Sequence, residues 1–362
     1  MKTVVVGLSG GVDSAVSAYL LKKQGYKVIG LFMKNWEDVD ASGHCQSEQD
    51  FEDVTRVCQM LDIPYYGVNF VKEYQERVFA DFLSEIKAGF TPNPDILCNR
   101  EIKFDVFLKK AMELGADYLA TGHYCQTDGI HLLRGLDANK DQSYFLYALK
   151  SQVLDKVLFP IGHLNKPQVR AIAKEQGLPV AEKKDSTGIC FIGKRPFKAF
   201  LENYIKPKPG LFIDENGKTI GQHDGSCFYT IGQRKGLKVG GPGDAWFVAK
   251  KDVERNQVTL VQGEEHPLLY SKELIATDVS WIADVPNFPL RCTAKVRYRS
   301  PDRPCTVESI GNTLRVIFDE PERAITPRQS IVLYDGQTCL GGAMISNTNL
   351  RFALPRTHEK TC

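Results

Sequence analysis

The sequence predicts an α/β protein with an N-terminal doubly wound parallel sheet, a small central β-rich domain and a C-terminal antiparallel β-barrel. Strand-like and helix-like patterns alternate over the first 205 residues, which is typical of a parallel sheet covered by helices. After a proline-rich linker at 206–210, short strands and glycine-containing turns take over, as in small antiparallel barrels. We therefore place domain boundaries at 1–205, 206–272 and 273–362.

The N-terminal elements follow one another in a regular order. The β-branched run at 2–8 predicts a strand, and the apolar residues Ala15, Val16, Tyr19 and Leu20 recur at helical spacing until Gly25. Further strands are predicted at 27–33, 65–70 and 117–122, and further helices at 48–62, 73–88, 99–114, near 168–176 and after Pro196. Ligands of such sheets bind at the carboxyl ends of the strands.

Four to six short strands are predicted in the last 90 residues. The alternating stretches are 274–281, 290–299, 305–310, 313–318, 330–334 and 338–345. Turn residues separate them, among them Gly311-Asn312 and Asp335-Gly336. This spacing fits a small antiparallel barrel.

Composition favours an ordinary globular protein. Of 362 residues, 43% are hydrophobic and 25% are charged, which excludes disordered and fibrous classes. No run of about 18 apolar residues occurs, and the apolar start at 4–8 is too short for a signal-peptide core, so we expect no membrane contact and a cytoplasmic location. The net charge is only +2, so a nucleic-acid partner needs local basic patches rather than overall attraction.

The segment Ser9-Gly10-Gly11-Val12-Asp13-Ser14 lies between the first predicted strand and helix. Glycines let backbone N–H groups turn inward, and a helix N-terminus adds partial positive charge, so the segment predicts an anion cradle. The serines can donate hydrogen bonds, and Asp13 can help to hold Mg²⁺. The segment is neither a Walker A loop nor Gly-x-Gly-x-x-Gly.

This loop resembles that of the PP-loop ATP pyrophosphatases, and longer motifs narrow the resemblance to the tRNA 2-thiouridylase family. The motifs that are similar are 30–36 (GLFMKNW), 91–99 (TPNPDILCN), 120–124 (ATGHY), 140–146 (KDQSYFL), 185–193 (DSTGICFIG), 232–237 (GQRKGL) and 297–299 (RYR). They follow in order over essentially the whole chain.

The resemblance implies ATP-dependent replacement of the C2 oxygen of the tRNA wobble uridine by sulfur. ATP activates that oxygen as an adenylate, with Mg²⁺ as its counter-ion, and a cysteine persulfide, loaded by a sulfur-donor protein, delivers the sulfur. Cys98 matches the catalytic cysteine and Cys190 the persulfide carrier. The implied ATP-binding residues are Gly7, Leu8, Ser9, Gly10, Gly11, Val12, Asp13, Ser14, Met33 and Gly122. The residues implied to face the target base are Asn93, Pro94 and Asp95, and those implied to contact tRNA are His123, Lys140, Asp141, Gln142, Arg297, Tyr298 and Gln329.

The residues themselves support these roles less sharply. Cys98 precedes a predicted helix, whose N-terminus would favour its thiolate, and Cys190 lies in a loop with Lys183 nearby. Taken alone, each cysteine is better explained as a buried structural thiol than as a reactive one. Asp95 reads either as a general acid or base or as a helix N-cap. Arg297 and Arg299 around Tyr298 suit RNA contact, or simply a solvent-facing strand.

Ten cysteines without any Cys-x-x-Cys spacing, and histidines without ligand spacing, give no support for a transition-metal site. Two other functions stay open from the residues alone. A PP-loop ligase acting on a small molecule would explain the phosphate loop but not the two cysteines. A non-catalytic sulfur carrier would explain the cysteines but not the phosphate loop.

Overall fold

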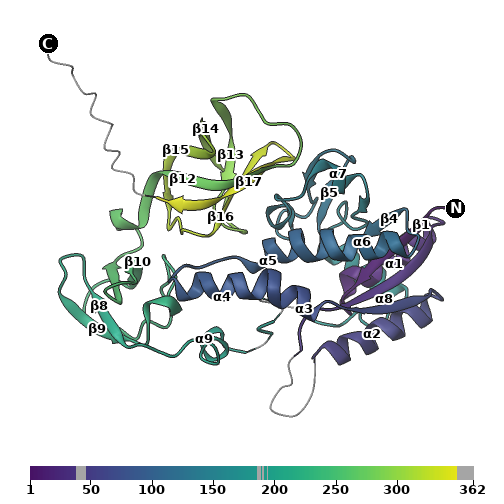
Figure 1. The fold of residues 1–362 in the computed structure, drawn as a ribbon, viewed down its shortest axis with the longest axis horizontal. Coiled ribbons are helices and arrows are strands. Elements are labelled where there is room, and N and C mark those ends of the chain that lie inside the picture. Colours follow the sequence, from purple (N-terminus) through teal and green to yellow (C-terminus); the bar gives the residue numbers. More distant parts are fainter. Residues whose placement is uncertain (38–45, 186–188, 190, 194, 349–362) are drawn as a thin grey trace.

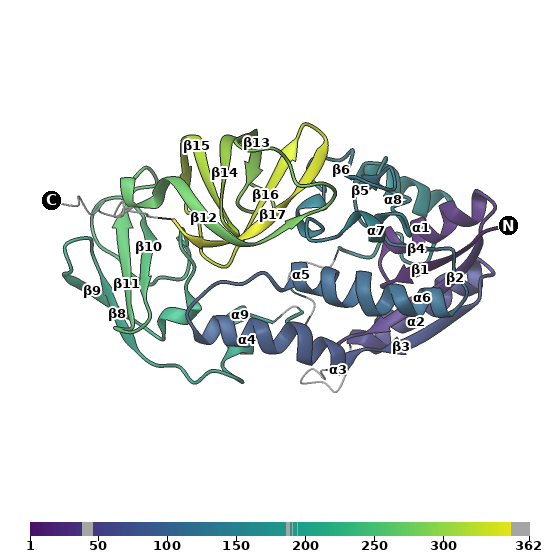
Figure 2. The same cartoon turned by 45° about the horizontal axis from the view of Figure 1, so that its top comes forward.

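The computed structural model describes residues 1–37, 46–185, 189, 191–193 and 195–348. Three β-rich parts surround a central pair of helical segments (Figures 1 and 2). The parallel sheet lies at one end, the central domain at the other, and the barrel packs above the helices between them. Cys190 lies outside the described residues.

The N-terminal sheet is parallel, with strand order β3-β2-β1-β4-β7. Its strands are β1 (Thr3–Leu8), β2 (Lys27–Lys34), β3 (Tyr65–Asn69), β4 (Tyr118–Ala120) and β7 (Val157–Leu158). The helices α1 (Val12–Lys23), α2 (Gln46–Met60), α8 (Lys166–Glu175) and α9 (Phe197–Leu201) follow in this part of the chain. The predicted doubly wound parallel sheet is confirmed, because β1 pairs in parallel with both β2 and β4 and so marks a switch in strand order.

Two long helical segments contain π-helical turns. The first runs through α3 (Val71–Tyr74), η1 (Gln75–Phe79) and α4 (Ala80–Lys87), and the second through α5 (Pro94–Leu97), η2 (Cys98–Val106) and α6 (Phe107–Glu113). The predicted start of the second helix at 99 is wrong. The helix begins at Pro94, since Asn93 accepts a hydrogen bond from the Asp95 N–H as its N-cap and proline is tolerated in a first turn. Cys98 therefore lies inside the helix.

The central domain is a four-stranded sheet of order β10-β11-β8-β9. Its strands are β8 (Gly210–Ile213), β9 (Thr219–His223), β10 (Trp246–Asp252) and β11 (Gln257–Gln262). Its own apolar core includes Phe212, Val248 and Leu260. Short helical turns, α7 (Ser151–Leu154), η3 (Ser143–Phe145), η4 (Ser226–Phe228) and η5 (Pro267–Leu269), connect other parts of the chain.

The C-terminal barrel is closed by pairing of its first strand with its last. Its strands are β12 (Tyr270–Trp281), β13 (Leu290–Lys295), β14 (Arg303–Ile310), β15 (Thr313–Arg323), β16 (Ser330–Asp335) and β17 (Thr338–Asn347), and β12 pairs antiparallel with both β15 and β17. All six predicted strands are confirmed. A hairpin from the first half of the chain, β5 (Cys125–Thr127) and β6 (Leu132–Arg134), adds to this sheet beside β17.

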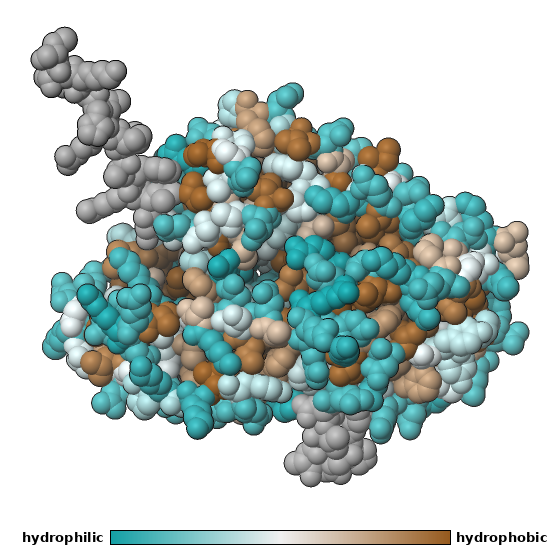
Figure 3. Space-filling view, viewed as in Figure 1, coloured by the Kyte–Doolittle hydropathy of each residue, from teal (hydrophilic) through white to brown (hydrophobic). Residues whose placement is uncertain are grey.

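The outer face in Figure 3 is a mosaic of hydrophilic and hydrophobic side chains. Such mixing is expected of a folded protein, because apolar atoms contribute a large part of its accessible surface. Within the described part of the chain, no helix is both long and apolar enough to cross a bilayer.

Candidate active site

The segment between β1 and α1 folds back on the first turn of the helix. The Ser9 backbone N–H donates to the Ser14 hydroxyl at 3.2 Å, and that hydroxyl donates to the Gly11 carbonyl at 3.1 Å. Gly11 is the N-cap of α1 and supplies no capping side chain. The first-turn N–H groups are thus left for an external anion, which suits a phosphate group.

Two glycines hold this loop by close backbone approach. Gly10 has a φ of +73°, and a Cβ there would lie 2.7 Å from the Asp50 carbonyl oxygen. A Cβ on Gly122, just after β4, would lie 2.9 Å from the backbone of Asp13 and Ser14. The residues predicted to bind nucleotide at 10–14 and 122 are therefore brought together at the carboxyl edge of the sheet.

The remaining predicted nucleotide-binding residues lie around this edge. Gly7 abuts the Phe107 ring, with an added Cβ 3.0 Å away. Leu8 and Val12 are buried in the core of the sheet. Met33, near the end of β2, packs against two apolar clusters, one of which contains Cys98.

Asp13 is the carboxylate that would hold Mg²⁺, and it already has two partners. The Lys166 ammonium lies 2.7 Å from one of its oxygens, and the Tyr124 hydroxyl donates to the same oxygen at 2.8 Å. A carboxylate fits a magnesium ligand, but the ion would have to compete with the ammonium. Among the described residues, no group of three or more His, Cys, Asp or Glu side chains is placed to hold a metal ion.

Asp95 and Cys98 lie one turn apart on the helix that begins at Pro94. Burial raises the pKa of the Asp95 carboxyl, and the Lys103 ammonium offsets part of this effect. Cys98 is only 3% exposed. Asn93, not Asp95, is the N-cap of this helix, so the Asp95 carboxyl does not serve as the cap.

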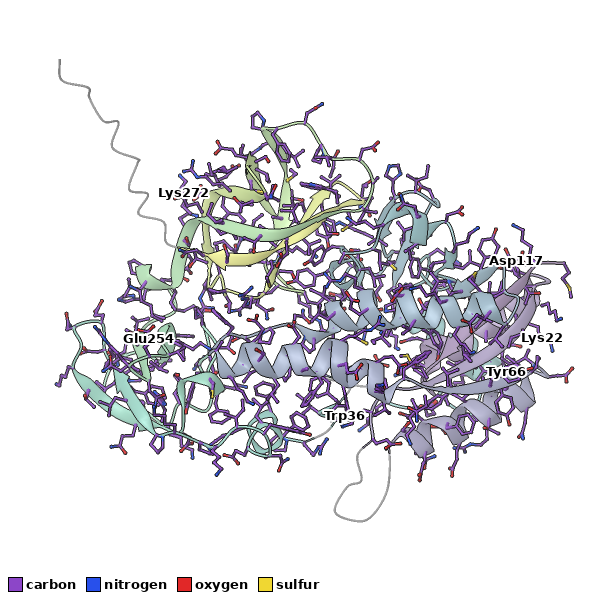
Figure 4. All side chains as sticks on the ribbon, in the orientation of Figure 1. Lys22, Trp36, Tyr66, Asp117, Glu254 and Lys272 are labelled. Atoms are coloured by element: carbon purple, nitrogen blue, oxygen red, sulfur yellow. The ribbon has the colours of Figure 1, made fainter. Side chains whose placement is uncertain are left out.

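Cys98 belongs to an apolar cluster that also contains residues from either side of position 190. We call this the Cys98 cluster; its buried members are Tyr74, Val78, Phe79, Phe82, Ile86, Cys98, Ile102, Phe191, Ile192, Phe200 and Leu201. Ile189 packs against it, and the Phe191 ring lies 5.1 Å from that of Phe82. Trp36, labelled in Figure 4, lies 5.4 Å from Phe191 and joins β2 to the cluster.

The positive charge of Lys183 is already paired with carboxylates of α2. Its ammonium lies 2.8 Å from the Asp50 carboxylate and also pairs with Asp53, both on α2. The expectation that Lys183 favours a nearby thiolate is therefore weakened, because two carboxylates already neutralise its charge.

Several residues predicted to contact tRNA are buried in the protein. His123 is 8% exposed, its ring nitrogen lies 2.8 Å from the Thr121 hydroxyl, and burial holds its pKa well below the usual range. Asp141 accepts hydrogen bonds from the Gly135 and Ser143 N–H groups, both at 3.1 Å. In this structure these side chains serve the fold, and contact with RNA stays a prediction.

Lys140 and Gln142 are also engaged with the protein. The Lys140 ammonium lies 2.7 Å from the Asp185 carboxylate. The Gln142 carbonyl oxygen accepts from the Tyr124 N–H at 2.9 Å. The 140–142 segment is thus fastened beside the phosphate loop, since Tyr124 is itself bonded to Asp13.

Arg297, Tyr298 and Gln329 lie where the barrel meets the other domains. The Arg297 guanidinium donates to the carbonyls of Ile231 at 2.8 Å and Ala324 at 2.9 Å. Tyr298 donates to the Lys140 carbonyl at 3.3 Å, and its ring lies 4.4 Å from that of Phe145. Gln329 donates to the Thr91 carbonyl, two residues before Asn93. These contacts make all three residues domain junctions in this structure.

Sequence reasoning missed Lys166 and Tyr124, the two partners of Asp13. Tyr124 stands in the ATGHY motif and could have been found there. Lys166 is 153 positions from Asp13 and carries no local pattern, so only the packing of α1 against α8 reveals it.

Three family models match the chain in succession. A model described as tRNA methyl transferase HUP domain matches residues 2–194, tRNA methyl transferase PRC-barrel domain matches 198–262, and Aminomethyltransferase beta-barrel domain matches 271–345. The tRNA-specific 2-thiouridylase MnmA of Protochlamydia amoebophila is 59% identical over 95% of this chain and 93% of its own. The chain belongs to the tRNA-specific 2-thiouridylase family.

Other members of the 2-thiouridylase family match to a similar degree. The MnmA protein of Alkaliphilus oremlandii is 57% identical over 94% of this chain and 96% of its own, and MnmA 2 of Geobacillus kaustophilus is 56% identical over 94% of each. A solved 4-thiouridine synthetase–RNA complex with bound ATP reaches a TM-score of 0.37 at 20% identity, over 56% of this chain and 49% of that one. Membership confirms the resemblance drawn from the motifs.

Proposed function

We propose that this chain catalyses ATP-dependent 2-thiolation of the wobble uridine of tRNA. The observation that carries the proposal is the Cys98 cluster, because one apolar cluster unites Cys98 with Phe191 and Ile192, which follow Cys190. Family membership supports the substrate class, and the phosphate loop supports the use of ATP.

The first step activates the base. The uridine C2 oxygen attacks the α-phosphorus of ATP, so that a C2–O–P bond forms, the bond to the β-phosphate breaks and pyrophosphate leaves. The first-turn N–H groups of α1 and the Ser9 and Ser14 hydroxyls would hold the phosphates, with Met33 and Gly122 against the nucleotide. Asn93, Pro94 and Asp95 would face the flipped base. The hydroxyls and N–H groups donate to oxygens whose negative charge grows as pyrophosphate departs.

The second step exchanges oxygen for sulfur. The terminal sulfur of a Cys190 persulfide attacks C2, AMP leaves with the oxygen, and the Cys98 thiolate then attacks the Cys190 sulfur. A Cys98–Cys190 disulfide forms while the transferred sulfur stays on C2, and a cellular thiol reductant reopens the bridge. In the alternative chemistry, Cys98 attacks the persulfide first and frees sulfide, which then attacks C2. Asp95, with its raised pKa, would exchange a proton with the base or the thiol.

The partners proposed are tRNA and a sulfur-donor protein that loads Cys190, in the cytoplasm. His123, Lys140, Asp141, Gln142, Arg297, Tyr298 and Gln329 are the proposed tRNA contacts. Because several of these are buried or bonded within the protein, their contact with RNA requires the local rearrangement that binding segments often undergo.

Release of AMP and pyrophosphate with and without tRNA tests the proposal. We expect both products only when tRNA is added, and 2-thiouridine in that tRNA by mass spectrometry when persulfide is supplied. Release without RNA would instead favour a small-molecule ligase, and no release at all would favour a sulfur carrier. Cys98→Ser and Cys190→Ser should each abolish multiple-turnover thiolation, with Cys227→Ser as the matched control on a half-buried cysteine outside the proposed steps.

A further inference from the structure

A buried lysine joins the phosphate loop to the motif that contains Cys190. Lys166 is 8% exposed and lies in the first turn of α8. Its ammonium lies 2.7 Å from the Asp13 carboxylate and 2.7 Å from the Asp185 carboxylate. Asp13 belongs to the phosphate loop, and Asp185 is the first residue of the 185–193 motif.

The position of Lys166 is costly for a cation. A positive charge is disfavoured at a helix N-terminus, where the helix dipole already places partial positive charge. Burial adds a desolvation penalty to that repulsion. The local structure nevertheless fixes the residue, because Asn165 and Gln168 form a capping box and the Lys166 N–H donates to Asp137 at 2.9 Å. The two carboxylates are what make the ammonium stable there.

The other cations around Asp185 do not reach Asp13. The Lys140 ammonium lies 2.7 Å and the Arg170 guanidinium 2.8 Å from the Asp185 carboxylate. Neither is ion-paired with Asp13 among the described residues. In the part of the chain that the structure describes, Lys166 is the one cation ion-paired with both carboxylates.

The segment leading to Asp185 is anchored on both sides of the phosphate loop. Arg170 donates to the carbonyls of Ala181 at 3.0 Å and Lys183 at 3.2 Å. Lys183 pairs with Asp50, whose carbonyl faces Gly10 of the loop. Helices α1 and α8 lie side by side in both ribbon views. A change in charge at Asp13 can therefore reach Asp185 through one shared ion-pair partner, Lys166.

We propose that Lys166 is a positioning residue that couples nucleotide binding at the phosphate loop to the placement of Asp185. The polyphosphate attracts the ammonium and withdraws it from Asp13, and Asp185 follows because it remains paired with the same ammonium. The inference builds on the proposed function, which gives the 185–193 motif its sulfur-carrying role. Lys166 touches neither the base nor the reacting sulfur.

Amide hydrogen exchange tests the coupling without any turnover. A non-hydrolysable ATP analogue with Mg²⁺, added at saturation, should change exchange in the 178–185 peptide of the wild-type chain by about fivefold or more, the lower end of typical coupling. Lys166→Met should abolish this response, whereas Lys174→Met, on the exposed face of the same helix, should retain it. An unchanged response in Lys166→Met would overturn the proposal.

A binding cycle gives a second, independent readout. If the two sites are coupled, Asp185→Asn should alter the dissociation constant of the analogue. That effect should vanish when Lys166→Met is already present, and equal effects in both backgrounds would contradict the coupling. Should Lys166→Met fail to fold, Asp185→Asn must lose the nucleotide response of the 178–185 peptide, because the ion pair with Lys166 is gone, while the peptide that contains Lys166 keeps its response. Neither readout requires thiolation, so a chain that responds to the analogue but leaves tRNA unmodified would sink the proposed function and spare the coupling.

Discussion

At the scale of single residues, Gly10 and Asp95 are the two positions of the site with the clearest local constraints. Gly10 combines a positive φ with a carbonyl that leaves no room for a Cβ. Asp95 is half-buried near a helix start, and desolvation raises the pKa of its carboxyl. Glycine adopts this φ without strain, whereas the desolvated Asp95 carboxyl carries a local energetic cost, as ionisable groups at functional sites often do.

Gly10→Ala should reduce both stability and nucleotide affinity. The added methyl group would be strained at φ +73° and would press on the Asp50 carbonyl, at a cost of about 2–3 kcal/mol in the free energy of unfolding. Gly25→Ala is the matched control, because it shares the positive φ but has nothing within 4 Å. Urea denaturation and ATP titration of the two variants measure the difference, and equal losses would show that the close approach at Gly10 is unimportant.

Asp95→Asn should abolish thiolation and make stability less dependent on pH. A carboxyl whose pKa is raised on folding binds its proton more tightly in the native state. Its contribution is present below the pKa of the unfolded chain and is lost as the pH rises through the raised folded pKa. The advantage of the variant in free energy of unfolding should therefore grow with pH across that window. Denaturation at a series of pH values checks this, and an advantage that shrinks with rising pH would contradict it.

At the scale of elements, the sequence predicts those helices and strands whose limits depend on local patterns. The strand at 2–8 and the glycine loop after it have a local periodicity and composition, and both predictions agree with the structure. The early start of the helix at Pro94 does have a local sequence signal, an asparagine N-cap followed by proline. Strands β5 and β6, three residues each, have no such signal, because β6 is stabilised by pairing with β17 about 200 positions away and β5 by pairing with β6.

Arg134 fastens this hairpin to the barrel. It stacks 3.6 Å from the centre of the Tyr334 ring and donates to Asp302 at 2.8 Å and to the Gly336 carbonyl at 3.1 Å. Arg134→Met should lower the free energy of unfolding by about 3 kcal/mol, since it removes the cation that lies 3.5 Å from the buried Asp141 carboxylate. Arg291→Met removes an exposed ion pair with Asp319 and should change it little. Similar losses in calorimetry for the two variants would refute the structural role of Arg134.

At the scale of the whole molecule, the segment before Asn93 is held by both other domains. Arg328 of the barrel lies 3.0 Å from the Glu85 carboxylate, and Val253 of the central domain packs against Gly89. Gln329 donates to the Thr91 carbonyl. The proposed base-facing loop is thus placed by contacts that no local sequence pattern could predict, because each joins residues more than 150 positions apart.

Arg297→Met should loosen this arrangement. The substitution removes the guanidinium donor of the Ile231 carbonyl and one of two donors of the Ala324 carbonyl, which should cost about 2 kcal/mol in the free energy of unfolding. Arg299→Met, at an exposed position two residues along, should weaken tRNA binding without this loss. Chemical denaturation and filter binding of tRNA separate the two effects. A stable Arg297→Met chain with weakened binding would mean that Arg297 acts on RNA alone.

The most direct test of the central claim is to trap the two cysteines after a single turnover. Protein carrying a persulfide on Cys190 is mixed with ATP and tRNA, quenched with a thiol-alkylating reagent and digested for mass spectrometry. We expect one 2-thiouridine for each Cys98–Cys190 disulfide peptide, and neither product when ATP is omitted. Thiolated tRNA formed at full yield by a Cys98→Ser chain over many turnovers would contradict the account.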